Sequence, residues 1–162
     1  KNIFYINNNY FLKLSERNDV KYLIVKKNYP NKIIIDLIPA KPICIIEINN
    51  NKIVLGDNGK KLDFEIKKDN LPIVTGSIDL DKIHNVVNLL RDSKLEYKLI
   101  KKINFFKSGR FDIHLRKGTI IKLPIKFTKD TIDYSSNLLN EKKFVNSKII
   151  DLRIKNKIIK YE

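Results

Sequence analysis

The chain has 162 residues, 43% of them hydrophobic and 31% charged, which is typical of a globular protein and excludes wholesale disorder. The single Cys excludes an intramolecular disulfide and a cysteine-based zinc site, and two His that stand far apart leave little for a histidine metal site. No apolar run is long enough to cross a membrane. The chain starts at Lys1 and contains no Met, so we expect a processed or truncated piece of a longer protein.

The net charge of +15 is unevenly distributed, with +4 in residues 1–79 and +11 in residues 80–162. A basic protein invites a nucleic-acid interpretation, but 28 of the 33 basic residues are Lys, whereas base and phosphate recognition favours Arg. The abundance of Lys, Ile and Asn also indicates an A/T-rich genome. We therefore expect no nucleic-acid partner, and we expect the second half to attract an acidic partner or an anionic membrane surface.

The first 41 residues predict one helix and one hairpin. Apolar side chains at helical spacing indicate a short helix over Asn7–Leu14 with an Asn cap. Two β-branched segments, Val20–Lys27 and Lys32–Ile38, flank a turn and predict an antiparallel hairpin. These elements are too few to close a core, so we expect more of this domain upstream of Lys1.

Two prolines, Pro39 and Pro42, interrupt the extended pattern, and we place a domain boundary there, between residues 1–41 and 42–162. In the second part a helix over Leu80–Ser93 is expected, capped by Asp79, and another beginning at Asp130 or Thr131. The first helix has an apolar stripe of Ile83, Val86, Val87 and Leu90, and the second has Ile132, Leu138 and Leu139 as inner residues. Strands are expected over Ile43–Ile48, Lys52–Leu55, Leu62–Ile66, Leu71–Gly76, Glu96–Phe106, Arg110–Arg116, Thr119–Leu123, Ser147–Ile154 and Lys157–Tyr161. The pattern predicts an α+β fold, mainly antiparallel, with two helices on one face.

The residues that could carry chemistry favour a protein that is not an enzyme. No glycine-rich phosphate loop, nucleophile elbow or metal-ligand spacing occurs, so we expect no catalytic residue, cofactor or metal. Cys44 lies among apolar neighbours and is expected to be buried and inert. We interpret His84 and His114 as exposed. Asp112 and Asp151 are expected to pair with the nearby arginines, Arg110 and Arg153.

The last predicted strand, Lys157–Tyr161, has no following element to cover it. An uncovered strand is a sheet edge, to which a partner can add a strand. The alternative is that the lysines at 155, 157 and 160 only guard this edge against aggregation.

Several motifs occur in the order found in a known family. The hairpin of residues 20–35, which runs through Pro30, resembles the last hairpin of a POTRA domain. It is followed by Ala40-Lys41-Pro42, Asp57-Asn58-Gly59, Leu71–Gly76, Arg110–Gly118, Ile121–Pro124 and Ile150-Asp151-Leu152-Arg153. This succession, from about Ile3 to Tyr161, resembles the FtsQ/DivIB family of bacterial cell division proteins, and its alphaproteobacterial branch in particular.

The resemblance implies the C-terminal part of a POTRA domain in residues 1–41 and an FtsQ-type β domain in residues 42–162. It further implies a non-enzymatic scaffold of the divisome at the septum, anchored in the inner membrane by one N-terminal helix absent from this chain, with this region periplasmic. The implied partners are FtsB-like and FtsL-like proteins, with FtsB adding a strand to the last strand. The implied partner-binding residues are Arg153, Ile154, Asn156, Lys157, Ile158, Ile159, Lys160 and Tyr161.

The chain departs from the family pattern in places. Ile154 stands where better-known members carry a Tyr that packs on the partner, and Phe111 replaces the usual Trp. Two other classes stay open: a POTRA-type chaperone of outer-membrane protein assembly, which would show further repeats, and a basic nucleic-acid-binding module.

Overall fold

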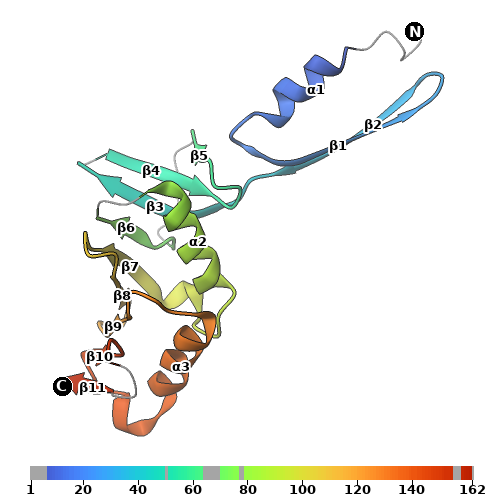
Figure 1. Ribbon diagram of the computed structural model, residues 1–162. Coiled ribbons are helices and arrows are strands. Elements are labelled where there is room, and N and C mark those ends of the chain that lie inside the picture. The colour runs from blue at the N-terminus through green and yellow to red at the C-terminus, as the bar shows by residue number, and fades with distance from the viewer. Residues whose placement is uncertain (1–6, 50, 64–69, 77–78, 155–157, 162) are drawn as a thin grey trace.

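The computed structural model describes residues 7–49, 51–63, 70–76, 79–154 and 158–161. These residues form a mixed α+β fold with a two-stranded and a nine-stranded sheet (Figure 1). The predicted fold class is therefore confirmed.

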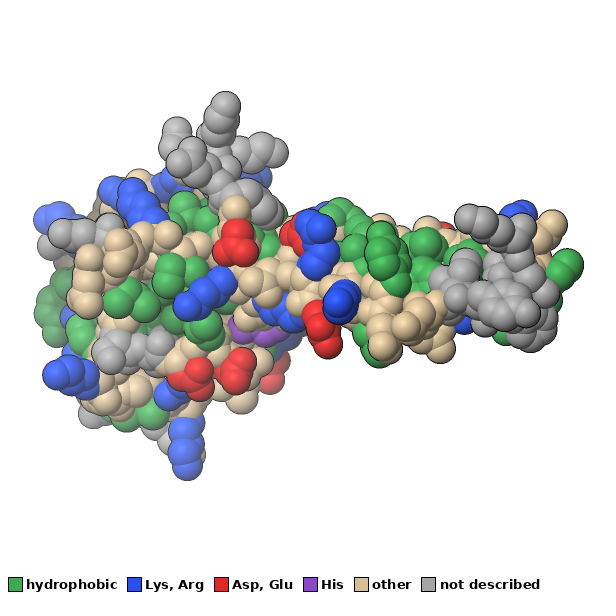
Figure 2. All heavy atoms as spheres, turned by 90° about the horizontal axis from the view of Figure 1, so that it is seen from above, with side chains coloured by type: hydrophobic (Ala, Val, Ile, Leu, Met, Phe, Trp, Pro, Cys, Tyr) green, Lys and Arg blue, Asp and Glu red, His purple; other side chains and the backbone are tan. Residues whose placement is uncertain are grey.

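The N-terminal helix and hairpin form as the sequence predicts. Helix α1 (Asn8–Ser15) starts after the cap Asn7, whose side-chain oxygen accepts a hydrogen bond from the Asn9 backbone N–H. Strands β1 (Val20–Asn28) and β2 (Lys32–Pro39) pair antiparallel. The hairpin projects from the end of the large sheet that holds β3, β4 and β5 (Figure 1). Hydrophobic side chains gather along this projecting arm (Figure 2).

The large sheet has the order β11-β10-β9-β8-β7-β6-β3-β4-β5. Its strands are β3 (Pro42–Ile48), β4 (Asn51–Gly56), β5 (Lys61–Leu62), β6 (Ile73–Thr75), β7 (Ile100–Phe105), β8 (Phe111–Leu115), β9 (Ile120–Lys122), β10 (Ile149–Asp151) and β11 (Ile159–Tyr161). Most neighbours are antiparallel, but β3–β6, β6–β7 and β9–β10 are parallel. A parallel pair needs a crossover connection. The helices α2 (Leu80–Arg91) and α3 (Lys129–Asn140) lie in two of these crossovers, between β6 and β7 and between β9 and β10.

Both crossover helices cover the same face of the large sheet and complete its core (Figure 1). Asp79 caps α2 as predicted, because its side chain accepts from the Asp81 N–H. The predicted stripe of α2 is buried, and so are the predicted inner residues of α3. They pack on alternate strand residues such as Val74, Ile103, Ile113, Ile121 and Ile150.

Several predicted boundaries are wrong. Thr128, rather than Asp130 or Thr131, caps α3, since Thr128 is extended and exchanges side-chain to backbone hydrogen bonds with Thr131 in a capping box. The strand predicted from Glu96 begins only at Ile100, because the Leu99 N–H bonds the Glu96 carbonyl in a 3-10 turn. The strands around Leu62, Ile150 and Ile159 are shorter than predicted, and parts of the first and last predictions lie outside the described residues.

The turn after β4 ties the projecting hairpin to the large sheet. The Asp57 carboxylate pairs with Lys21 Nζ at 2.8 Å and accepts the Lys41 backbone N–H at 2.8 Å. The neighbouring Asn58 amide donates to the carbonyls of Asn18 at 2.8 Å and Val20 at 3.0 Å. Charged side chains of both signs lie at this junction (Figure 2). These polar contacts restrict the direction in which the hairpin projects from the large sheet.

Candidate functional site

Strand β11 is one end of the nine-stranded sheet, as the uncovered last strand of the sequence predicts. It pairs antiparallel with β10, with Tyr161 opposite Ile149, Lys160 opposite Ile150 and Ile159 opposite Asp151. Among the described residues no strand pairs with its other side. Its outer N–H and C=O groups therefore face away from the sheet, which is the geometry that strand addition requires.

The predicted site residues are only partly strand residues. Ile159, Lys160 and Tyr161 form β11, and Ile158, just before it, packs against the core. Arg153 and Ile154 follow the end of β10 and are exposed. Two further predicted residues, Asn156 and Lys157, lie outside the described residues.

Arg153 is held by a carboxylate of its own chain. Its Nε donates to both carboxylate oxygens of Asp151, at 2.8 and 3.0 Å, and its backbone N–H donates to Asp151 Oδ1 at 3.1 Å. The Asp151 side chain is only 5% exposed, whereas that of Arg153 is 36% exposed. These hydrogen bonds lower the pKa of Asp151 and raise the pKa of Arg153. The predicted Asp151–Arg153 pair is thus confirmed. It holds the guanidinium beside the C-terminal end of β10, the strand that pairs with β11.

The other predicted pair is wrong. Arg110 stacks on the Phe106 ring, with its guanidinium carbon 4.5 Å from the ring centroid, and its Nε has no hydrogen-bond partner in the described part of the chain. Asp112 is buried, and its Oδ1 also lacks a partner among the described residues. Burial raises the pKa of Asp112, against the opposing field of Lys122 and the arginines. The cation–π contact draws the Arg110 side chain onto the aromatic ring instead of the carboxylate.

The thiol and the two imidazole side chains are fully or partly buried. Cys44 is fully buried, as predicted, and burial raises the pKa of its thiol to about 12. The histidines were expected to be exposed, but both are half-buried. His84 lies 3.3 Å from the Asp57 carbonyl and 3.1 Å from the Asn88 amide, and burial lowers the pKa of His114. In the described part of the chain no three His, Cys, Asp or Glu side chains gather as metal ligands.

Sequence reasoning missed two sets of contacts. The turn at Asp57-Asn58-Gly59 was recognised, but its contacts with Lys21 and Asn18 join residues about forty positions apart, and no local pattern signals them. The connection between α3 and β10 was also missed. It lies against β11, because the Lys148 N–H bonds the Tyr161 carbonyl at 2.8 Å. Across the described residues, no helix is both long and apolar enough to span a bilayer.

Comparison with known proteins gives this fold a family. The sequence profile "Cell division protein FtsQ/DivIB, C-terminal" matches residues 44–153. The chain is 31% identical over 147 residues to the cell division protein FtsQ of Rickettsia bellii, covering 85% of this chain and 53% of that protein. It is 30% identical over 161 residues to FtsQ of Rickettsia felis, covering 90% of this chain and 58% of that protein. It therefore spans about half the length of these relatives.

A solved structure also resembles the chain. The major extracytoplasmic domain of the division protein DivIB from Geobacillus stearothermophilus aligns with a TM-score of 0.48 and 15% identity, covering 62% of this chain and 91% of that one. The family profile covers more than half of the chain and includes both crossover helices and the strands from β3 to β10 except for the first two residues of β3. The chain belongs to the FtsQ/DivIB family of bacterial cell division proteins.

Proposed function

We propose that the chain is part of a non-enzymatic scaffold of the divisome, which binds FtsB-like and FtsL-like proteins during septum formation. The proposed contact with the FtsB-like partner is strand addition to β11. Family membership supports the role in division. The position of β11 at the end of the sheet is the single observation that carries the binding mode.

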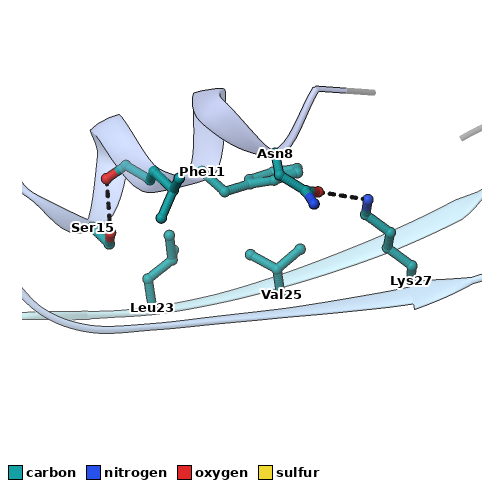
Figure 3. A pocket seen from close by; sticks show the side chains of 7 residues that line it. Asn8, Phe11, Ser15, Leu23, Val25 and Lys27 are labelled. Carbon is teal, nitrogen blue, oxygen red and sulfur yellow. Dashed lines mark hydrogen bonds between the residues drawn. The ribbon is translucent and has the colours of Figure 1, made fainter. Parts of the chain in front are cut away.

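We also propose that residues 1–41 and 42–162 are two domains, the first being the C-terminal part of a POTRA domain. In support, α1 and the hairpin form a unit with its own two-stranded sheet. Phe11 of α1 lies across an open groove from Leu23 and Val25 of β1 (Figure 3). The groove has a volume of about 670 Å³, and Leu12 also lines it. The helix buries none of its residues, so this unit has much less core than the large sheet.

We further propose that a full-length form is a single-pass inner-membrane protein at the division septum, with this region outside the membrane. Membership of the family supports this location.

The binding mode is tested by replacing Ile159 with Pro. Proline removes the Ile159 backbone donor, and its ring obstructs the pairing of β11 with β10, so Ile159→Pro should displace the edge strand and abolish binding of the extracytoplasmic segment of the FtsB-like partner. Isothermal titration calorimetry gives the affinity, and circular dichroism checks the fold. The matched control is Lys61→Pro in β5, at the opposite end of the sheet, which should bind as the parent does. Unchanged affinity of folded Ile159→Pro would show that the partner docks elsewhere.

A further inference from the structure

The two faces of β11 carry different side chains. In the register, Lys160 is opposite Ile150, which is fully buried in the core beneath the helices. Tyr161 and Ile159 are opposite Ile149 and Asp151. Because consecutive side chains of a strand point to opposite faces, Lys160 lies on the helix-covered side and the other two lie on the open side.

The helix-covered side of this edge is basic. Lys160 Nζ donates to the Lys143 carbonyl at 3.4 Å, so the connection of residues 141–148 lies beside β11 on that side. Lys142, Lys143 and Lys148 in this connection are all exposed. Glu141 is the only acidic residue of the connection, and it pairs with Lys143 at 3.0 Å. A partner strand next to β11 would therefore meet a surplus of positive charge on this side.

The open side of the same edge is apolar. Register pairs place Ile120, Ile149 and Tyr161 in one row across β9, β10 and β11. Tyr161 is 51% exposed, and both isoleucines of the row are partly exposed. Ile159 stands beside Asp151, whose charge is already matched by Arg153. A partner side chain on this side would contact apolar surface next to a neutralised ion pair.

We propose that β11 selects an extended partner segment in which acidic and apolar side chains alternate. The acidic side chains face Lys160 and the lysines of the 141–148 connection, and the apolar ones face Ile159 and Tyr161. Cross-strand neighbours of opposite charge, or both apolar, stabilise a sheet, whereas like charges destabilise it. This inference rests on the proposed strand addition and adds the chemistry that the partner must have.

Fluorescence anisotropy with short labelled peptides tests the pattern on the 162-residue chain. One peptide alternates Glu with Val and Ile, a second has the same composition with all Glu at one end, and a third replaces Glu with Gln. We expect the alternating peptide to bind about tenfold more tightly than either of the others. Equal binding of the alternating and segregated peptides would overturn the proposal.

Charge reversal tests whether the lysines beside β11 contribute to binding of the acidic peptide. The double variant Lys143→Glu, Lys160→Glu should weaken the alternating Glu peptide about tenfold and leave the Gln peptide nearly unchanged. Lys52→Glu, an exposed lysine near the opposite end of the sheet, is the matched control and should have little effect. An equal effect of the control and the double variant would also overturn the proposal.

The two proposals fail in distinguishable ways. Suppose that Ile159→Pro abolishes partner binding, but neither the charge of the peptide nor the alternation of its side chains affects binding. Strand addition then stands, and the proposed preference for alternating acidic and apolar side chains is wrong. If folded Ile159→Pro binds every peptide and the partner as the parent does, strand addition itself is wrong.

Discussion

Two carboxylates on the open face of the sheet have opposite electrostatic situations. Asp151 on β10 is surrounded by donors from Arg153, and its pKa is lowered. Asp112 on β8 is buried, one of its oxygens has no hydrogen-bond partner among the residues that the structure describes, and burial raises its pKa. The charged carboxylate of Asp151 therefore stabilises the fold, because it gains hydrogen bonds on folding. The charged carboxylate of Asp112 destabilises it, because it loses its contacts with water.

Replacing each carboxylate with its amide tests this difference. Since the pKa of Asp151 is lowered on folding, its contribution to stability is present above the ordinary carboxyl pKa and is lost as the pH falls through the folded value. Asp151→Asn should lower the free energy of unfolding at neutral pH by about 1–3 kcal/mol, with a smaller effect in acid. Asp112→Asn should leave it unchanged or raise it, because the charged form is the costly one. Urea unfolding at several pH values measures both, and a loss of stability in Asp112→Asn would contradict the assignment.

Helix α2 buries the apolar stripe of its sequence in the core. Its polar flank includes His84 and Asn88, and its apolar stripe packs on the strands. Leu90 is fully buried, whereas the adjacent Leu89 is only partly buried. The helix depends on this stripe, since an isolated helix of 12 residues is marginal in water.

Truncation of these two leucines measures the value of the stripe. Leu90→Ala should lower the free energy of unfolding by about 2–5 kcal/mol, because it removes a buried side chain and leaves a cavity. Leu89→Ala has the same chemical change and should cost clearly less. Chemical denaturation followed by circular dichroism gives both values, and equal losses would mean that α2 packs in another orientation.

The shape of the whole molecule depends on the junction between hairpin and sheet. Asp57 and Asn58 contact backbone and side-chain groups on the hairpin side. A small cluster of Ala40, Val54 and Leu62 lies at the same place. These contacts hold the hairpin in one direction relative to the sheet whose far end is β11 (Figure 1).

Spin-label distances test whether this turn sets the direction. Labels at Lys26→Cys on β1 and Lys94→Cys after α2 report the separation by pulsed electron resonance, and buried Cys44 should stay unlabelled. Asp57→Ala should broaden the distance distribution, because it removes the ion pair with Lys21 and the Lys41 contact. Asp36→Ala, an exposed acid on β2, is the control and should not. A distribution of unchanged width in Asp57→Ala would exclude this role.

Local patterns determined much of the secondary structure. An Asn cap for α1, the cap Asp79 of α2, the hairpin of β1 and β2 and the stripe of α2 were all predicted, because each depends on side-chain spacing or on hydrogen bonds within a few residues. The position of β11 at one end of the large sheet was also predicted, and the strand order confirms it.

Tertiary structure alone decided the remaining features. The parallel neighbours β3–β6 and β9–β10 join strands that are distant in sequence, and alternation within one strand does not specify its partner. The sequence suggested similar ion pairs for Asp112 and Asp151, yet within the described ranges only Asp151 of the two has one, and Arg110 lies on the Phe106 ring instead. The lysines of the α3–β10 connection lie beside β11 because the Lys148 backbone N–H bonds the Tyr161 carbonyl. These outcomes depend on contacts between distant residues, which no local sequence pattern encodes.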